Sequence, residues 1–257
     1  MKKIKLGIVG CGRVAQHYKF ILDSGIVKNF VVSSVCDKEI EKAKKFSQNF
    51  NCKYFDKIEE MINNTEIDLI IILTPSGEHF NNSKISLTMG CHTLVEKPIT
   101  LLPNQAEELE KISTSSNLMY GVVYQNRFNP AIQLLDKELK LGNFGKIITS
   151  SIRLRWCRMQ EYYQDEWHGT WKQDGGVLAQ QGIHYIDLLC YFFGKPLKAI
   201  SVLSNVSNKL EAEDTHIGII KFKNATCTIG LTTALRPTDL KGSIEIICQK
   251  NIKITQK

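Results

Sequence analysis

Short apolar runs alternate with mixed, charged segments through the first half of the chain. The apolar runs predict strands at 4–10, 31–36, 68–74, 92–95 and 119–124, with a short one near 53–54. The segments between them predict helices over 14–24, 38–49, 57–63, 79–89 and 103–115. Residues 68–74 are almost uninterruptedly apolar, as in a strand whose sheet is covered on both faces. Alternating strands and helices indicate βαβ units, so residues 1–124 are predicted to form an α/β domain with a parallel sheet.

The pattern changes after residue 124. Helices are predicted over 129–141 and 176–193, the second ending at the stop signal Gly194-Lys195-Pro196. Strands that alternate polar and apolar positions are predicted at 146–156, 198–206, 215–223, 226–235 and 243–248. Alternation of this kind is typical of an antiparallel sheet with one solvated face. We therefore predict that residues 125–257 form an α+β domain with a mainly antiparallel sheet.

Composition narrows the class of protein. The chain has 257 residues, 43% hydrophobic and 23% charged, which is typical of a soluble globular protein. It has no apolar run of 18 residues and no signal-peptide pattern, so we expect no membrane span and a cytoplasmic location. Its net charge of +7 is spread over predicted helix surfaces, so nucleic-acid binding is not expected, whereas an anionic substrate would suit it. The eight cysteines are dispersed without a CxxC pair and are interpreted as reduced core residues.

A glycine motif follows the first predicted strand. Gly10 and Gly12 begin the pattern G-x-G-x-x-A, which continues through Arg13 and Val14 into a helix. Such glycines allow a tight turn and let the backbone approach a pyrophosphate at the helix N-terminus. Asp37 ends the second predicted strand, where an acidic residue binds the ribose hydroxyls. The motif predicts a Rossmann dinucleotide-binding domain that prefers NAD to NADP, although the neighbouring Lys38 would weaken that preference.

Two further loops follow predicted strands of this domain, at the sheet edge where open α/β sheets bind ligands. Thr74-Pro75 leads toward His79 and is expected near the cofactor, or else Thr74 or Ser76 caps the next helix. Glu96-Lys97-Pro98 ends the strand at 92–95. Lys97 can transfer a proton if burial or a nearby positive charge lowers its pKa, or as a cation it can stabilise an alkoxide.

The second half of the chain contains further candidate polar residues. His184 and Asp187 are three residues apart on a predicted helix and share a face, which suits a general base with a neighbour, or a histidine satisfied within the core. The segment from Trp167 to Gly176 combines aromatic rings with hydrogen-bonding groups and would suit a sugar. Arg153, Arg155 and Arg158 could meet phosphates or form a solvated strand face. His168, His184 and Asp187 could belong to a metal site, but no further ligand pattern completes the set, and we predict none.

Together these motifs resemble the glucose-fructose oxidoreductase, inositol dehydrogenase and MocA (Gfo/Idh/MocA) family. The resemblance covers essentially the whole chain: the glycine motif, Thr74-Pro75, Glu96-Lys97-Pro98, residues 125–130, Gly175-Gly176, and Gly182-x-His184-x-x-Asp187. Within the family the chain looks most like bacterial enzymes that oxidise the 3-hydroxyl of UDP-N-acetyl sugars such as UDP-N-acetylglucosaminuronate. The segments that carry this likeness are Trp167-x-Gly169-Thr170-Trp171, residues 181–189, Glu213-Asp214-Thr215 and Arg236-Pro237. His168 stands where that pattern has an arginine.

The resemblance implies an NAD-dependent oxidoreductase of surface-polysaccharide sugar biosynthesis. Lys97 and His184 would be catalytic, with His184 the first choice for the base and Lys97 for the charge stabiliser. The predicted cofactor-binding residues are Gly10, Gly12, Arg13, Val14, Asp37, Thr74, Pro75, His79, Glu96, Lys97 and Asn126. The predicted substrate-binding residues are Arg127, Arg153, Trp167, Thr170, Trp171, Gln180, Gln181 and His184. Another sugar or polyol dehydrogenase of the family, or a catalytically inactive NAD-binding regulatory homologue, are the alternatives.

Assembly and chain length complete these expectations. The sheet of this family usually packs against a second subunit, so a homo-oligomer through the C-terminal sheet is expected. Relatives continue for dozens of residues beyond the segment that matches 242–247, whereas this chain ends at Lys257. A truncated gene, a fragment and a complete short variant would all look like this. We expect a sheet of four remaining strands without its last ones, lower stability, imperfect association and an incomplete substrate pocket.

Overall fold

The computed structural model describes residues 3–165, 167–250 and 253–255. Met1 and Lys2, which the sequence places directly ahead of the first strand, lie outside the described residues. The chain forms two compact units, Met1–Val123 and Tyr124–Lys257, and each is described by itself.

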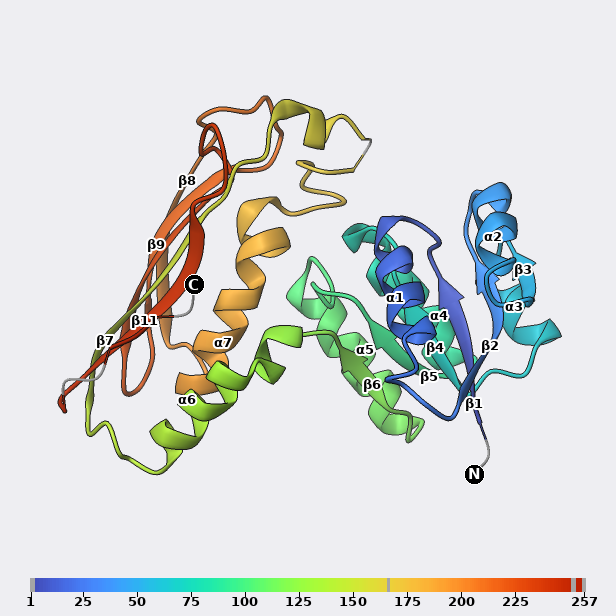
Figure 1. Ribbon diagram of the computed structural model, residues 1–257, viewed down its shortest axis with the longest axis horizontal. Coiled ribbons are helices and arrows are strands. Elements are labelled where there is room, and N and C mark those ends of the chain that lie inside the picture. Colours follow the sequence, from blue (N-terminus) through green and yellow to red (C-terminus); the bar gives the residue numbers. More distant parts are fainter. Residues whose placement is uncertain (1–2, 166, 251–252, 256–257) are drawn as a thin grey trace. The chain divides into compact units, whose positions relative to one another are not determined.

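The first unit is a parallel sheet with helices between its strands (Figure 1). Its strands run in the order β3-β2-β1-β4-β5-β6, and every neighbouring pair is parallel. This is the order of a dinucleotide-binding Rossmann sheet, as predicted. The elements are β1 Ile4–Val9, α1 Arg13–Asp23, β2 Phe30–Cys36, α2 Ile40–Ser47, β3 Lys53–Phe55, α3 Ile58–Asn64, β4 Leu69–Ile72, η1 Ser76–Glu78, α4 His79–Thr88, β5 His92–Val95, α5 Pro103–Ser115 and β6 Tyr120–Val122.

Both faces of this sheet are covered. Consecutive residues of β1 are buried, Ile8 on one face and Val9 on the other. Ile8 joins a cluster that includes Ala15 of α1 and Phe46 of α2, and Val9 joins one that includes Met61 of α3. Burial on both faces explains why the central strands are apolar without alternation.

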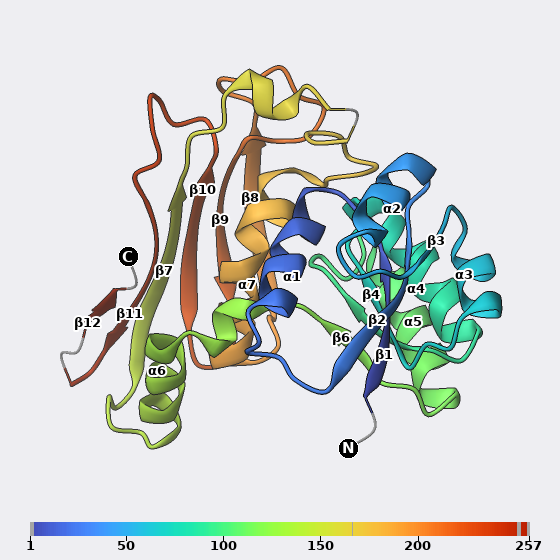
Figure 2. The same ribbon diagram turned by 45° about the vertical axis from the view of Figure 1, so that its right-hand side comes forward.

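The second unit is a six-stranded sheet with the order β12-β11-β7-β10-β9-β8 (Figure 2). Every neighbouring pair is antiparallel except β7 and β10, so the sheet is mixed and mainly antiparallel, as predicted. The count of four remaining strands was wrong. The elements are η2 Gln125–Phe128, α6 Pro130–Lys140, β7 Ile147–Arg155, η3 Gln160–Tyr163, η4 Leu178–Gly182, α7 Ile183–Phe193, β8 Lys198–Ser204, β9 Thr215–Lys221, β10 Thr226–Thr232, β11 Lys241–Cys248 and β12 Lys253–Thr255.

Helix α7 packs on one face of this sheet (Figure 1). Its Leu188 and Leu189 are fully buried in one cluster with Leu154 of β7 and Leu231 of β10. Alternate residues of each strand therefore point away from α7. They form a row across the opposite face, which we call the outer face and which includes Val202, Ile217, Gly230, Arg153 and Ser243. In the part of the chain that the structure describes, no helix is long and apolar enough to cross a membrane.

Candidate functional site

Four strands of the first unit end at the same level of the sheet. Val9 pairs with Cys36 on one side and with Ile72 on the other, and Ile72 pairs with Val95. The predicted cofactor residues after β1, β2, β4 and β5 therefore gather at one edge. Backbone bonds hold this edge, from Gly10 N to Cys36 O at 2.8 Å and from Glu96 N to Ile72 O at 3.0 Å. This is the edge of an open α/β sheet at which ligands bind.

Gly10 and Gly12 have different reasons to be glycine. Gly10 has a φ of +93°, and a Cβ there would lie 2.7 Å from the carbonyl carbon of Leu73. It is required because the turn passes against the β4 loop. Gly12 begins α1 with a φ of −82°, and a Cβ there would meet nothing within 4 Å. Gly12, Arg13 and Val14 are all exposed, so open space remains for a ligand at the helix N-terminus.

Asp37 supports the glycine loop. Its Oδ2 accepts a hydrogen bond from the Cys11 backbone N–H at 2.8 Å, and its Oδ1 accepts one from the Glu39 N–H at 2.9 Å. The carboxylate is thus fixed beside the loop, where its remaining lone pairs can accept bonds from hydroxyl groups. Lys38 is exposed next to it. The same carboxylate would repel a 2′-phosphate placed beside it.

The loop after β4 corrects one prediction. His79 was expected to bind the cofactor, but its side chain is 1% exposed, and its Nδ1 and Nε2 lie 2.6 Å and 2.9 Å from the carbonyl oxygens of Pro98 and Thr74. Burial lowers the pKa of His79, although the two carbonyls act to raise it. Its ring joins the loops that carry Thr74 and Lys97, and a contact between His79 and the cofactor stays a prediction. Neither Thr74 nor Ser76 caps a helix, because Pro75 and Glu78 are the N-cap residues there and make no side-chain cap.

Lys97 is the second residue after β5 and is half-buried. The preceding carboxylate, Glu96, accepts a hydrogen bond from the Lys97 backbone N–H at 3.2 Å and one from the Tyr18 hydroxyl of α1 at 2.9 Å. Burial, together with Glu96, raises the pKa of the Tyr18 phenol, so Tyr18 remains a donor. Glu96 therefore fixes the backbone of Lys97. Sequence reasoning missed Tyr18, since a tyrosine on a helix carries no signal for a partner 78 residues away.

In the second unit, one continuous helix carries Gln180, Gln181 and His184. Residues 178–182 form a π-helical turn, and α7 continues from Ile183, so the predicted helix over 176–193 is confirmed. Gln180 and Gln181 are buried and His184 is half-buried. A π-turn is uncommon and is often found at functional sites, because it changes the direction of side chains within a helix.

Arg127 and Asp187 tie η2 to this helix. Nε and Nη2 of Arg127 donate to the two carboxylate oxygens of Asp187 at 2.7 Å and 2.5 Å, and its guanidinium lies against the rings of Tyr124 and Tyr191. Asp187 was expected to be the neighbour of His184. Both oxygens of its carboxylate accept hydrogen bonds from Arg127. The side chain of Arg127 is still 39% exposed, and Asn126 is half-buried beside it.

Among the residues that the structure describes, no three or more His, Cys, Asp or Glu side chains are arranged to hold a metal ion.

The loop that precedes the helix carries Trp167, Thr170 and Trp171. The Thr170 hydroxyl donates to Trp167 O at 2.8 Å and accepts from Gln173 N at 3.2 Å. Both bonds lie within the loop, and a contact between Thr170 and the substrate stays a prediction. Trp171 is 47% exposed, whereas Trp167 is half-buried and stacks on His168. The prediction that aromatic rings of this loop contact a sugar therefore stands for Trp167 and Trp171.

Arg153 does not lie with the other predicted substrate residues. Leu154, its neighbour in β7, faces α7, so Arg153 points to the outer face, next to Gly230 and Ser243. It lines a shallow hollow of about 450 Å³ there with Arg155, Ile217 and Thr228. Arg153 was predicted to bind the substrate or to belong to a solvated strand face. Its position on the outer face fits the second alternative, and a role in substrate binding stays a prediction.

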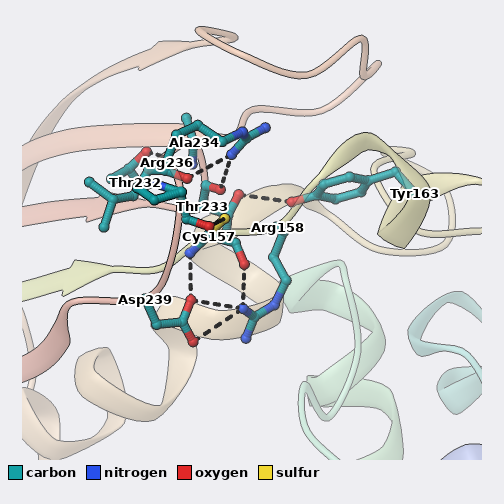
Figure 3. A network of polar contacts seen from close by, with 10 residues as sticks. Cys157, Arg158, Tyr163, Thr232, Thr233, Ala234, Arg236 and Asp239 are labelled. Atoms are coloured by element: carbon teal, nitrogen blue, oxygen red, sulfur yellow. Dashed lines mark hydrogen bonds and ion pairs between the residues drawn. The ribbon is translucent and has the colours of Figure 1, made fainter.

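Arg158 is held in a polar network beyond the end of β7 (Figure 3). Its Nη1 donates to Cys157 O at 2.7 Å and to Asp239 Oδ1 at 3.1 Å, and Asp239 also accepts from the Cys157 backbone N–H. Tyr163 is hydrogen-bonded to Thr233 at 2.8 Å in the same network. These contacts pin residues 157–163 to the loop after β10. The charge of Arg158 is thus paired with the carboxylate of Asp239 within the fold.

Comparison with protein families adds two matches. Residues 4–124 match a family described as "Oxidoreductase family, NAD-binding Rossmann fold", and residues 132–252 match one described as "GFO/IDH/MocA C-terminal domain".

Solved structures similar to this chain include two WlbA dehydrogenases, each in complex with NADH and UDP-GlcNAcA. The enzyme from Bordetella pertussis is 28% identical with a TM-score of 0.95. The match covers 99% of this chain and 73% of that enzyme. The enzyme from Chromobacterium violaceum is 30% identical with a TM-score of 0.95. The match covers 99% of this chain and 74% of that enzyme. Among curated proteins, the scyllo-inositol 2-dehydrogenase (NADP(+)) IolW of Bacillus subtilis is 25% identical over 82% of this chain. This chain spans only 57% of that relative's length.

Proposed function

Since the chain belongs to the GFO/IDH/MocA oxidoreductase family, we propose that it oxidises the 3-hydroxyl of a UDP-N-acetyl sugar, of the UDP-N-acetylglucosaminuronate type, with NAD. The observation that carries this proposal is the likeness over 99% of the chain to two dehydrogenases that hold NADH and UDP-GlcNAcA. Curated relatives that act on inositol and D-glucoside favour a second candidate, a dehydrogenase of another sugar or polyol.

The geometry of the first unit supports the cofactor assignment. The exposed N-terminus of α1 offers N–H groups to a pyrophosphate, and Gly12 leaves the space for it. Asp37 is fixed at the end of β2, where it would accept bonds from ribose hydroxyls. Bound NAD would supply the hydride acceptor.

The reaction divides into a hydride transfer and a proton transfer. Bound NAD would accept the hydride of the C3–H bond, and His184 or Lys97 would take the proton of the 3-hydroxyl, which would leave a ketone at C3. The group that does not take the proton stabilises the charge on the sugar oxygen. A histidine titrates near neutral pH, so His184 is our first choice for the base.

We expect NAD reduction with UDP-N-acetylglucosaminuronate, measured at 340 nm, to exceed that with UDP-N-acetylglucosamine, UDP-glucose, myo-inositol and D-glucose. NADP in place of NAD is expected to lower the rate because of Asp37. Turnover of inositol alone would favour the second candidate. Binding of NADH without turnover of any sugar in the panel would contradict a catalytic function.

We also propose that the outer face of the second unit binds a second copy of the chain. Four large apolar residues of β8 and β9 point outward there and are 48–70% exposed: Ile200, Val202, Ile217 and Ile219. Contiguous apolar patches of this kind mark interaction surfaces. We expect sedimentation equilibrium to show a homo-oligomer for the wild type and a smaller species for Ile217→Asp/Ile219→Asp. A wild type that stays monomeric at about 100 μM would exclude this interface, because a dimer with a dissociation constant of about 1 μM would be almost fully formed at that concentration.

A further inference from the structure

The motif Glu213-Asp214 precedes β9 and has no role in the chemistry described so far. Asp214 is fully buried, and its carboxylate accepts hydrogen bonds from the backbone N–H groups of Val206, Ser207 and Asn208 at 2.9–3.1 Å. Its own carbonyl accepts from Thr233 N at 2.9 Å. Asp214 therefore anchors this segment rigidly to the end of the sheet.

Glu213 reaches from this anchor to the start of the helix that carries His184. Its carbonyl accepts a hydrogen bond from Val177 N at 3.0 Å, and its Oε1 accepts one from Leu178 N at 3.1 Å. Both N–H groups belong to the first turn, whose donors have no partner within the helix. A single residue thus satisfies two of them, although it lies 35 residues from Leu178 in sequence.

Gly176 is fitted to this carboxylate. A Cβ at Gly176 would lie 1.9 Å from Glu213 Oε2, and the residue has a φ of +78°. Glu213 is 5% exposed, so its carboxylate fills the space that the missing side chain leaves. The turn Gly175-Gly176 and the carboxylate are therefore complementary, which fixes where the helix begins.

The same segment also holds the aromatic loop. The backbone N–H groups of Glu211 and Ala212 donate to Gly169 O at 3.1 Å and 2.8 Å. The sheet end, the loop with Trp167 and Trp171, and the helix start with Gln180, Gln181 and His184 are thus joined through residues 211–214. Only Glu213 within this segment uses a side chain to hold the helix start itself.

We propose that Glu213 is a positioning residue for the proposed oxidation: its carboxylate fixes the first turn of the helix, and so sets the place of Gln180, Gln181 and His184. The inference rests on the proposed function for its catalytic consequence. A shift of about 1 Å in a reacting group can cost about 100-fold in rate. Burial raises the pKa of Glu213, with Asp174 and Asp214 adding to the effect, so a neutral amide of the same shape should replace it well.

The test compares Glu213→Ala, Glu213→Asp and Glu213→Gln with the wild type. Only Gln has both the length and an acceptor oxygen for Leu178 N. We expect hydrogen exchange of the amides in residues 177–184 to become about tenfold faster in Ala and Asp, because a hydrogen bond is lost, and to stay near wild type in Gln. We expect kcat on the best substrate to fall about 10- to 100-fold in Ala and Asp, with the KM for NAD unchanged and Gln restoring most of kcat.

Glu161→Ala, which changes an exposed glutamate of the same unit, is the matched control and should behave like the wild type. Wild-type exchange at 177–184 in both Ala and Asp would overturn the inference, as would a Gln variant that is as defective as Asp. If Glu213→Ala fails to fold, the comparison of Glu213→Asp with Glu213→Gln still tests the inference. If the exchange pattern is as expected but the wild type oxidises no sugar, the proposed function fails and the placement of the helix by Glu213 stands.

Discussion

Lys97→Ala and His184→Ala should each lower turnover on the best sugar nucleotide by about 10²–10⁴-fold, the usual contribution of a general acid or base. Lys97 is the second residue after β5, and Glu96 holds its backbone N–H. His184 lies in the first turn of α7, on a helix whose partner contacts include the Arg127–Asp187 ion pair. Because the backbone of Lys97 is held by Glu96 and His184 stands on a helix, removal of either side chain should remove chemistry and leave the fold in place. Initial rates at saturating NAD are the measurement.

Binding of NADH separates this effect from damage to the cofactor site. We expect the fluorescence titration of NADH to change little in either variant. Lys97 is only one of the predicted cofactor contacts, and Gly10, Gly12 and Asp37 lie outside the substitutions. Lys111→Ala, an exposed lysine on α5, is the matched control and should keep full activity. Near wild-type turnover in one of the two variants would show that this residue is not the acid, base or charge stabiliser. The pH profile of the more active variant then identifies the group that still titrates.

Gly10→Ala should destabilise the first unit and abolish NADH binding, whereas Gly12→Ala should spare stability and weaken binding only. At Gly10 the new Cβ would lie 2.7–2.8 Å from backbone atoms of Leu73 and Thr74, and the φ of +93° is strained for alanine. Backbone atoms cannot swing aside as a flexible side chain can, so the loops after β1 and β4 must separate. We expect a loss of at least about 2 kcal/mol, from strain and overpacking together.

The two glycines form a matched pair because they differ in what surrounds the new methyl group. At Gly12 a Cβ meets nothing within 4 Å of protein, so only a ligand close to the backbone would feel it. Thermal melts and NADH titrations of both variants are the measurements. A Gly10→Ala protein that melts with the wild type would contradict the close approach. Unchanged NADH affinity in Gly12→Ala would mean that the pyrophosphate does not approach that residue.

Local pattern and spacing determined much of this protein from the sequence alone. Apolar runs in 4–10 and 68–74 predicted buried parallel strands, because a strand covered on both faces has no polar alternation. The glycine motif and Asp37 were predicted to lie together, and Asp37 does bond the Cys11 N–H of that loop. Such features depend on neighbours within one βαβ unit, so short-range rules are sufficient for them.

Tertiary structure alone decided which polar groups serve the fold and which remain available to a ligand. His79 and Thr170 looked like site residues, yet their polar atoms are used by carbonyl and amide groups of nearby loops. The period of two in β7 puts Arg153 and Arg155 on one face of the strand, but only the packed structure shows that α7 covers the opposite face. The contact of Glu213 with Leu178 joins segments far apart in sequence, and its geometry exists only after the sheet, the turn at Gly176 and the helix have packed together.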